Sequence, residues 1–278
     1  MQNKKVLTIQ DISCYGQCSI TVALPILSAW GMETAILPSA ILSTHTAGFK
    51  NFTVHDLSNE IPSIIKHWKD EGLKFDCLYS GYLGETNHID LVIQIKNSLL
   101  KENAPFILDP VMGDNGKIYP AFNDGYVKAM KRLIKEADVI IPNLTEACLL
   151  TGLEYKTNYD KEYIDKVIDG LKSIGAKTII LTGISYEKDT TGIIYYDSDG
   201  YHYYQHRLVN ASYHGTGDIY ASTLVGAYLN DIDLFTSSKI AAHFVIKSIE
   251  NTLNDDTHKY GVKFEPLLVD YINEVINK

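Results

Sequence analysis

Cysteine is scarce in this sequence of 278 residues, which contains only Cys14, Cys18, Cys77 and Cys148. Four scattered cysteines are too few for a disulfide framework, because small disulfide-stabilised domains contain many cysteines in a short chain. The spacing of Cys14 and Cys18 also differs from the known zinc-binding patterns. We therefore expect reduced thiols, most of them packed in the interior.

Long hydrophobic runs are missing as well. The polar residues 1–5 lead directly into a strand-like run at 6–9, without the apolar segment of a signal peptide, and no later run is long enough to cross a bilayer. This pattern predicts a cytoplasmic protein that does not insert into a membrane.

Basic charge is in deficit, since the formal net charge is -9 and the isoelectric point is near 5.4. Nonspecific binding to nucleic acid or to an anionic membrane requires a basic face, so we expect neither partner. An anionic ligand such as ATP must then be held by local backbone amides and a metal ion.

The most widely used nucleotide-binding motifs are also absent. Residues 113–118 have the wrong spacing for a P-loop, and no glycine-rich dinucleotide motif follows the first predicted strand. Zinc-binding helix motifs and the nucleophile elbow are not found either. These absences argue against a P-loop enzyme and against a Rossmann dehydrogenase.

Short apolar runs alternate with longer amphipathic segments along the chain, which is typical of βαβ units and a mostly parallel sheet. An apolar content of 45% is enough for one large core, and no break in composition separates two domains. We therefore predict one α/β domain over residues 1–278. Strands are expected at residues 6–9, 33–37, 76–79, 106–108, 139–141 and 178–181, a β-hairpin at 192–208, and helices at 19–30, 56–71, 87–101, 126–136, 160–174, 233–253 and 266–276.

The most informative segment consists of Gly215, Thr216, Gly217 and Asp218, which lead into a helical run of small and apolar residues at 219–229. Unpaired amides at a helix N-terminus attract phosphate, and glycine permits its close approach. The carboxylate of Asp218 would repel that phosphate unless it takes a proton from the attacking group. The alternative is a plain helix start, in which Thr216 or Asp218 caps the first turn.

Polar residues follow several predicted strands, at the carboxyl ends where open α/β sheets bind ligands. Asp109 and Asp114 follow the strand at 106–108, and a simple turn would explain one of these acids but not both. Asn143 and Glu146 follow the strand at 139–141 with the spacing of a capping box, so the residues alone make Glu146 structural.

Six of these strand-end segments, taken in order, resemble motifs of the ribokinase superfamily, and within it the branch of pyridoxal kinases and hydroxymethylpyrimidine kinases. The resemblance covers nearly the whole chain. Residues 44–46 and 80–84 are the most similar to pyridoxal kinases, which favours vitamin B6 over a sugar as the acceptor. The six segments lie at residues 9–16, 43–46, 80–84, 109–114, 142–146 and 215–218.

The resemblance implies a ribokinase-like three-layer sandwich, in which helices cover both faces of a mostly parallel sheet. It also implies ATP-dependent phosphorylation of the 5′-hydroxymethyl group of pyridoxal, pyridoxine or pyridoxamine in B6 salvage, with Mg²⁺ as cofactor and a monovalent cation as a further candidate. The habit of the family predicts a homodimer.

The resemblance further implies a role for individual residues. Asp218 matches the catalytic base, and Gly215, Thr216 and Gly217 match the anion hole. Asp109 and Glu146 match the positions that organise Mg²⁺, a family role that here replaces the capping interpretation of Glu146. The residues that would contact ATP are Asp109, Asp114, Asn143, Glu146 and Thr182, together with Arg207, Leu208, Val209 and Asn210 around the adenine.

The acceptor substrate would contact Asp11, Thr46, Tyr82 and Asp218. Asp11 departs from the family pattern, because many pyridoxal kinases have serine at this position, in contact with the pyridine ring. An aspartate can accept a hydrogen bond from a ring hydroxyl or pair with a protonated amine. Pyridoxamine or a hydroxymethyl aminopyrimidine therefore fits at least as well as pyridoxal.

Other functions stay open on the sequence. The first is the hydroxymethylpyrimidine kinase of thiamine synthesis, which would use the same fold and base. The second is a noncatalytic relative that binds vitamer and nucleotide, although the combination of Asp218, Asp109 and Asp114 argues against it. A sugar kinase is the third alternative.

Overall fold

A nine-stranded sheet, in the order β11-β10-β9-β8-β5-β4-β1-β2-β3, forms the centre of the computed structural model, which describes residues 4–46, 48–255, 258 and 260–276. The neighbours from β2 to β9 in this order pair in parallel, and the outer strands β3, β10 and β11 pair antiparallel. The mostly parallel sheet predicted from the sequence is confirmed; residues 1–3 and 277–278 of the predicted domain lie outside the described residues. The strands are β1 (Lys5–Ser13), β2 (Glu33–Leu42), β3 (Val54–Asp56), β4 (Cys77–Ser80), β5 (Phe106–Leu108), β8 (Val139–Ile140), β9 (Thr178–Thr182), β10 (Thr190–Asp197) and β11 (Gly200–Arg207).

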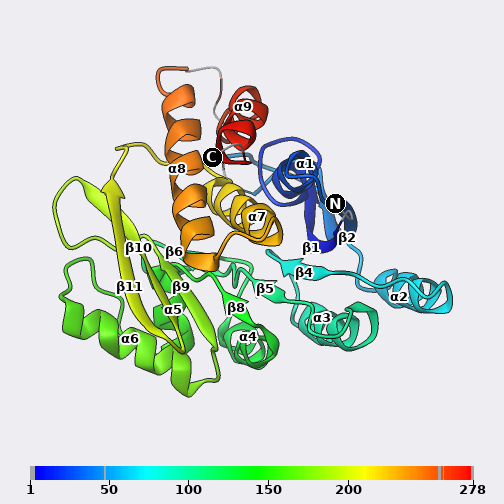
Figure 1. The fold of residues 1–278 in the computed structure, drawn as a ribbon. Helices are drawn as coiled ribbons and strands as arrows, with labels where there is room; N and C mark the ends of the chain where they lie inside the picture. The colour runs from blue at the N-terminus through cyan, green and yellow to red at the C-terminus, as the bar shows by residue number, and fades with distance from the viewer. Residues whose placement is uncertain (1–3, 47, 256–257, 259, 277–278) are drawn as a thin grey trace.

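Helices cover both faces of the sheet, as the resemblance implied (Figure 1). Among the described residues, none of the helices is both long and apolar enough to span a membrane. One face carries α1 (Ile20–Ala29), α7 (Thr216–Leu229), α8 (Leu234–Thr252) and α9 (Glu265–Ile276), and the other carries α2 (Ile61–Asp70), α3 (Thr86–Leu99), α4 (Asp124–Glu136), α5 (Leu144–Thr151) and α6 (Lys161–Ser173).

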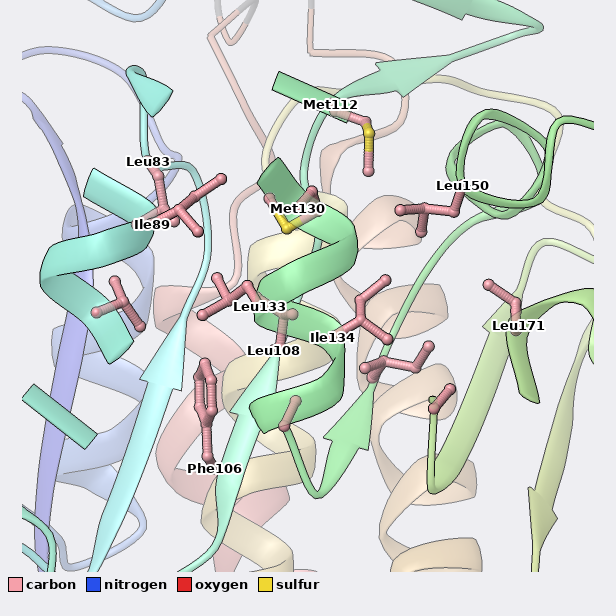
Figure 2. Close-up of a cluster of buried hydrophobic side chains, with 14 of the residues drawn as sticks. Leu83, Ile89, Phe106, Leu108, Met112, Met130, Leu133, Ile134, Leu150 and Leu171 are labelled. Carbon is pink, nitrogen blue, oxygen red and sulfur yellow. The ribbon is translucent and has the colours of Figure 1, made fainter. Parts of the chain in front are cut away.

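Each face of the sheet has its own hydrophobic core, because successive side chains of a strand point to opposite faces. In β4, Leu78 packs with the α2–α6 side, whereas Cys77 and Tyr79 pack with α1, α7 and α8. Figure 2 shows the first of these cores, in which Leu133 and Ile134 of α4 lie over Leu108 of β5. Apolar burial on both faces explains the continuous apolar strands of the sequence.

The cysteines are free thiols, as expected. Cys77 and Cys148 are buried, Cys18 is partly buried and Cys14 is exposed. The predicted antiparallel hairpin is also present, with β10 paired to β11 at one edge of the sheet. Most side chains of β11 are half-buried. This agrees with the density of tyrosine and histidine in the segment.

Strand β2 is longer than predicted, because it continues through Pro38 to Leu42 instead of ending at Leu37. Pro38 pairs with Gln10 of β1, while β3 joins the other side of β2 only from Ala40 onward. The missing N–H of Pro38 is tolerated where the strand has one neighbour and no second partner requires a donor. The strand therefore ends just before the motif segment at residues 43–46.

Helix α2 begins at Ile61, and not at residue 56 as the sequence suggested. Asp56 ends the short strand β3, and its Oδ1 accepts a hydrogen bond from the N–H of Ser58 at 3.0 Å. Asp56 therefore stabilises a turn before the helix, since an aspartate can bond its own backbone two residues on.

Residues 113–118 form a small hairpin, β6 (Gly113–Asp114) and β7 (Lys117–Ile118), in a segment for which the sequence predicted no strand. Asn115 and Gly116 between the strands have φ values of 50° and 74°. Two central residues of positive φ are the requirement of a two-residue hairpin turn, and asparagine followed by glycine is its preferred pair.

The contact between α1 and α7 requires glycine at position 226. A Cβ atom built on Gly226 would lie 2.4 Å from Cγ of the buried Trp30. We expect Gly226→Ala to lower the unfolding free energy by about 1–3 kcal/mol, the usual cost of overpacking a core. Urea denaturation measures this. Gly217→Ala in the same helix, whose Cβ would meet only an oxygen of Asp109 at 4.0 Å, is the matched control. Equal stabilities of the two variants would contradict the packing argument.

Candidate functional site

The carboxyl ends of the parallel strands lie level with one another, which brings their polar side chains to one edge of the sheet. Ser80 pairs with Leu108, and Leu108 pairs with Ile140. The next residue, Asp109, donates its N–H to the carbonyl of Ser80 at 2.9 Å. Asn143 bridges to Thr182 at the end of β9. The structure thus gathers the predicted strand-end residues along one edge.

The N-terminus of α7 lies against this edge. Gly215 is its N-cap and has φ 79°, in the left-handed region that favours glycine, and a Cβ there would meet the carbonyl oxygen of Gln17 at 2.0 Å. No side chain caps the helix among the described residues. The first-turn amides are thus available for an anion, and the interpretation of Thr216 or Asp218 as a cap is wrong.

Asp218 points away from its own helix and toward the start of α1. Its Oδ2 accepts a hydrogen bond from the N–H of Ser19 at 2.9 Å. Burial raises the pKa of Asp218 to about 7, with a further contribution from Asp11, while the bond from Ser19 lowers it. A carboxyl group that titrates near neutral pH is suited to accept a proton during a reaction.

Two more carboxyl groups lie buried beside this one. Burial raises the pKa of Asp109 well above its usual range, and the negative charges of Glu146 and Asp218 raise it further. Gly217 of the helix N-terminus faces Asp109, since a Cβ added to this glycine would lie 4.0 Å from Asp109 Oδ2. The three acids Asp109, Glu146 and Asp218 therefore form a cluster of carboxyl groups with raised pKa next to the amides of α7.

Glu146 has two structural tasks in addition. It completes the capping box of α5, where its Oε2 accepts from the N–H of Asn143 at 2.9 Å and Asn143 Oδ1 accepts from the N–H of Glu146 at 2.9 Å. Its Oε1 accepts from the N–H of Met112 at 3.1 Å. Burial raises the pKa of Glu146 to about 8, although these amides lower it. The resemblance to the family led us to expect a role of Glu146 in Mg²⁺ binding instead of capping. The structure confirms that Glu146 caps α5.

The donor set of the cluster suits Mg²⁺, a cation that prefers oxygen ligands. Among the described residues, no three His, Cys, Asp or Glu side chains form a group that would hold a metal by themselves. This is the usual situation for Mg²⁺ in kinases, since the ion keeps several waters and binds one or two carboxylates together with substrate phosphates. Asp109 and Glu146 would supply the carboxylates.

The predicted acceptor side lies at the ends of β1 and β4. Asp11 is buried, and its Oδ2 accepts a hydrogen bond from Ser13 Oγ at 3.0 Å. Burial raises the pKa of Asp11, although Ser19 and Ser13 lower it by hydrogen bonding. The pKa of Tyr82 rises to about 12, through burial and then through the charge of Asp11. Asp11 and Tyr82 therefore lie together, whereas Thr46 is exposed on the loop after β2.

Other predicted nucleotide contacts lie farther out. Asp114 is exposed in the β6–β7 hairpin, and its two oxygens accept from the N–H and the side-chain amide of Asn115 at 2.8 and 2.9 Å. Arg207 forms an ion pair with Glu250 of α8. The N–H of Leu208 donates to the carbonyl of Asp189 at 3.0 Å, and Val209 and Asn210 follow on the segment that leads to α7.

Two residues that sequence reasoning missed belong to the site. Ser19, which the sequence marks only as the start of a helix, holds Asp218 through its N–H. Tyr119, after the hairpin, lies near four acids: burial raises the pKa of its phenol, and the charges of Glu146, Asp114, Asp109 and Asp218 raise it further. No pattern in the sequence marks Tyr119, because only the fold brings it to the cluster.

A ribokinase-like sheet with an uncapped helix N-terminus beside a buried acid defines a phosphate-handling α/β protein of the small-molecule kinase type. The chain belongs to the phosphomethylpyrimidine kinase family, whose model matches residues 27–263.

Solved structures agree with this fold over nearly the whole chain. Pyridoxal kinase from Lactobacillus plantarum is 31% identical with a TM-score of 0.90, and the match covers 99% of this chain and 98% of that one. A putative phosphomethylpyrimidine kinase from Bacteroides thetaiotaomicron, in a crystal form with pyridoxal, is 32% identical with a TM-score of 0.91 and coverages of 98% and 96%. Pyridoxal kinase from Leishmania donovani, in complex with ADP and pyridoxamine, shares the fold at 21% identity, with a TM-score of 0.84 and coverages of 98% and 96%.

The buried acids predict how stability depends on pH. Glu146 and Asp218 have ordinary pKa values of 4.5 and 3.8, but about 8 and about 7 in the folded protein. The folded state thus retains protons that the unfolded chain has released, so stability falls as pH rises. Histidines whose pKa is lowered by folding affect the unfolding free energy mainly below pH 7. Between pH 7 and 8 we expect the unfolding free energy to drop by about 1 kcal/mol.

Urea denaturation of the ligand-free protein at both pH values checks this expectation. Glu146→Gln should reduce the drop in unfolding free energy, because the variant lacks the carboxyl group that retains a proton in the folded state. Glu102→Gln on the surface should leave the drop unchanged. A free energy that stays constant or increases between pH 7 and 8 would contradict the assignment.

Proposed function

We propose that this protein is an ATP-dependent kinase that phosphorylates the 5′-hydroxymethyl group of a vitamin B6 vitamer. The observation that carries the proposal is the position of Asp218, a half-buried carboxyl with a pKa of about 7 in the first turn of an uncapped helix. The family of the chain and its similarity to pyridoxal kinase and to a relative with bound pyridoxal support the choice of acceptor.

In the proposed reaction, Asp218 accepts the proton of the substrate's hydroxymethyl group, while the oxygen of that group forms a bond to the γ-phosphorus. The bond between the γ-phosphorus and the bridging oxygen breaks, and ADP leaves. Amides of Gly215, Thr216 and Gly217 hold the charge of the transferring phosphoryl group, because they point outward from the helix start. The N–H of Ser19 keeps the carboxylate of Asp218 in one orientation.

Asp109 and Glu146 would hold Mg²⁺, which when bound neutralises charge on the ATP phosphates. Without a cation, burial favours the protonated state of both acids, and the charge of Glu146 raises the pKa of Asp109 further. Asn143 and Thr182 lie on the same edge and would contact the nucleotide phosphates. Asp114 would join them from the hairpin, and residues 207–210 would contact the adenine.

Asp11, Thr46 and Tyr82 would bind the acceptor. The buried Asp11 lies beside Tyr82, and its raised pKa means that a cationic or hydrogen-bond-donating group on the substrate would stabilise its charged form. This favours pyridoxamine among the vitamers. Hydroxymethylpyrimidine is the second candidate acceptor, because its amino group offers the same chemistry and the family is described by a pyrimidine substrate. A homodimer stays a prediction, as does a requirement for a monovalent cation.

Asp218→Asn should lower kcat by about 10² to 10⁴, because the general base is lost. Binding of ATP should persist, since the amides of α7 are unchanged. Steady-state assays and calorimetric titration with ATP and Mg²⁺ measure the two quantities. Thr216→Ala serves as control and should have a milder effect, because the anion hole consists of backbone groups. Turnover near the wild-type level in Asp218→Asn would disprove the assigned base, and ATP and vitamer binding without product in the wild type would favour a noncatalytic relative.

Asp11→Ser should change the choice of acceptor. Loss of one charged hydrogen bond should reduce kcat/KM for pyridoxamine by about tenfold or more relative to pyridoxal. Asp11→Asn keeps the size of the side chain but removes its charge, so this variant separates the effect of charge on acceptor choice from the effect of shape. Turnover with pyridoxamine, pyridoxal, pyridoxine and hydroxymethylpyrimidine gives the comparison. An unchanged order of acceptors would show that Asp11 does not select them, and turnover of the pyrimidine alone would move the protein to thiamine metabolism.

A further inference from the structure

Gln17 lies in the loop between β1 and α1, and residues from the C-terminal end of the chain bind it on several sides. Its N–H donates to the carbonyl of Tyr260 at 2.9 Å. Its side-chain Nε2 donates to Glu265 Oε1, and its Oε1 lies 2.7 Å from His258 Nε2. Because an amide oxygen can only accept, the imidazole Nε2 carries the hydrogen of this last bond. Residues 258 and 260–265 therefore form a clasp around one glutamine, which we call the C-terminal clasp.

The clasp packs tightly against the loop. A Cβ atom built on Gly261 would lie 2.5 Å from Gln17 Cβ and 2.9 Å from its Oε1, and the φ of this glycine is +139°. The close approach and the backbone conformation both require glycine. The ring of Tyr260 packs edge-on against the ring of Tyr15, with the centroids 5.3 Å apart. The clasp therefore holds the loop at two nearby positions, through hydrogen bonds and through packing.

The same loop contacts the anion-binding turn and the proposed base. The carbonyl of Gln17 lies against Gly215, where a Cβ would meet this oxygen at 2.0 Å. Two residues farther on, the N–H of Ser19 donates to Asp218 Oδ2 at 2.9 Å. One short loop thus connects the C-terminal clasp to both parts of the proposed phosphoryl-transfer site.

The backbone at Ser19 is strained. Its φ is 55° and its ψ is -130°, a combination that residues other than glycine rarely adopt. Such a conformation costs free energy and persists only where the surroundings hold it. Thr21 Oγ1 of α1 holds the loop by donating to the carbonyls of Gly16 and Cys18 at 3.0 and 2.7 Å. The clasp holds Gln17, the residue between these two carbonyls.

We propose that Gln17 is a positioning residue, through which the C-terminal clasp keeps the base and the anion hole in place. The clasp fixes the loop, and the loop keeps Ser19 in the strained conformation that aims its N–H at Asp218. The contact between the Gln17 carbonyl and Gly215 fixes the turn whose amides would hold the transferring phosphoryl group. The catalytic part of the inference rests on the proposed function, whereas the clasp itself does not.

An exchange of the bonded pair tests the positioning role. Gln17→Glu places two carboxylates against each other, so the loop should loosen and kcat should fall by about tenfold or more, with the KM for ATP within about twofold of the wild type. Glu265→Gln alone should have a small effect, because Gln17 can still donate to an amide oxygen at position 265. The variant with both changes again pairs an amide with a carboxylate, so its kcat should recover to within about threefold of the wild type.

Gln205→Glu is the matched control for this exchange. Gln205 Nε2 donates to Glu187 Oε2 at 2.8 Å, so the same substitution again places two carboxylates against each other, but on the edge strand β11. This variant should keep the kcat of the wild type. Wild-type kcat in Gln17→Glu, or a double variant as slow as that single variant, would overturn the positioning role.

A pair of glycine variants tests the same contact without changing the loop. Gly261→Ala would press a methyl group against Gln17 Cβ, whereas the Cβ added by Gly200→Ala would have no atom within 4 Å. The φ values of the two glycines are nearly equal, +139° and +140°, so both variants should lose stability through the same backbone strain. Only Gly261→Ala should lower kcat, by about threefold or more. Equal kcat in the two variants would contradict the inference.

The outcomes separate this inference from the proposed function. If Asp218→Asn is inactive but Gln17→Glu keeps the wild-type kcat, the base is correctly assigned and the positioning role is wrong. If the wild type phosphorylates none of the acceptors, the proposed function fails and the positioning role fails with it. The clasp is then judged by Tm alone: Gln17→Glu should lower Tm by roughly 2 to 4 °C, and the added Glu265→Gln should restore it. A Tm that the second change does not restore would disprove the clasp.

Discussion

The level pairing of the parallel strands is the constraint on which the site depends. Because β1, β4, β5, β8 and β9 run in one direction, the residues after their last hydrogen-bonded positions gather along a single edge. Each strand contributes a polar side chain there at little cost, since the chain leaves the apolar interior at that point. The two hydrophobic cores hold the strands rigidly, and the loops above them can vary in chemistry without changing the frame.

The acids at this edge of the sheet cost stability through their electrostatics, and the same acids are what the proposed reaction uses. Asp109 and Glu146 are buried, the neighbouring Asp218 is half-buried, and each has a raised pKa. Such a cluster destabilises the ligand-free protein at neutral pH, but it is suited to a cation and to a group that must exchange a proton. The uncapped start of α7 is a similar feature, because a helix end without a capping side chain gives up local stability in return for free amides.

Close backbone contact links these parts. Gly215 fits against the carbonyl of Gln17 only because it has no Cβ, and the same loop places the N–H of Ser19 on Asp218. The β1–α1 loop thereby orients both the anion-binding turn and the base.

The sequence alone is enough to predict the α/β class, most helices and strands, and the identity of the acids after the strands. These follow from local rules, since periodicity and turn residues act over a few positions. It misplaced the end of β2 and the start of α2, because Pro38 is tolerated only through the late arrival of β3 and Asp56 is used by a turn. Tertiary packing is needed to see that Glu146, the capping residue of α5, lies beside Asp109, that Ser19 holds Asp218, and that Tyr119 joins the cluster. The reason is physical: burial and the approach of charges from distant segments depend on how helices and strands pack together.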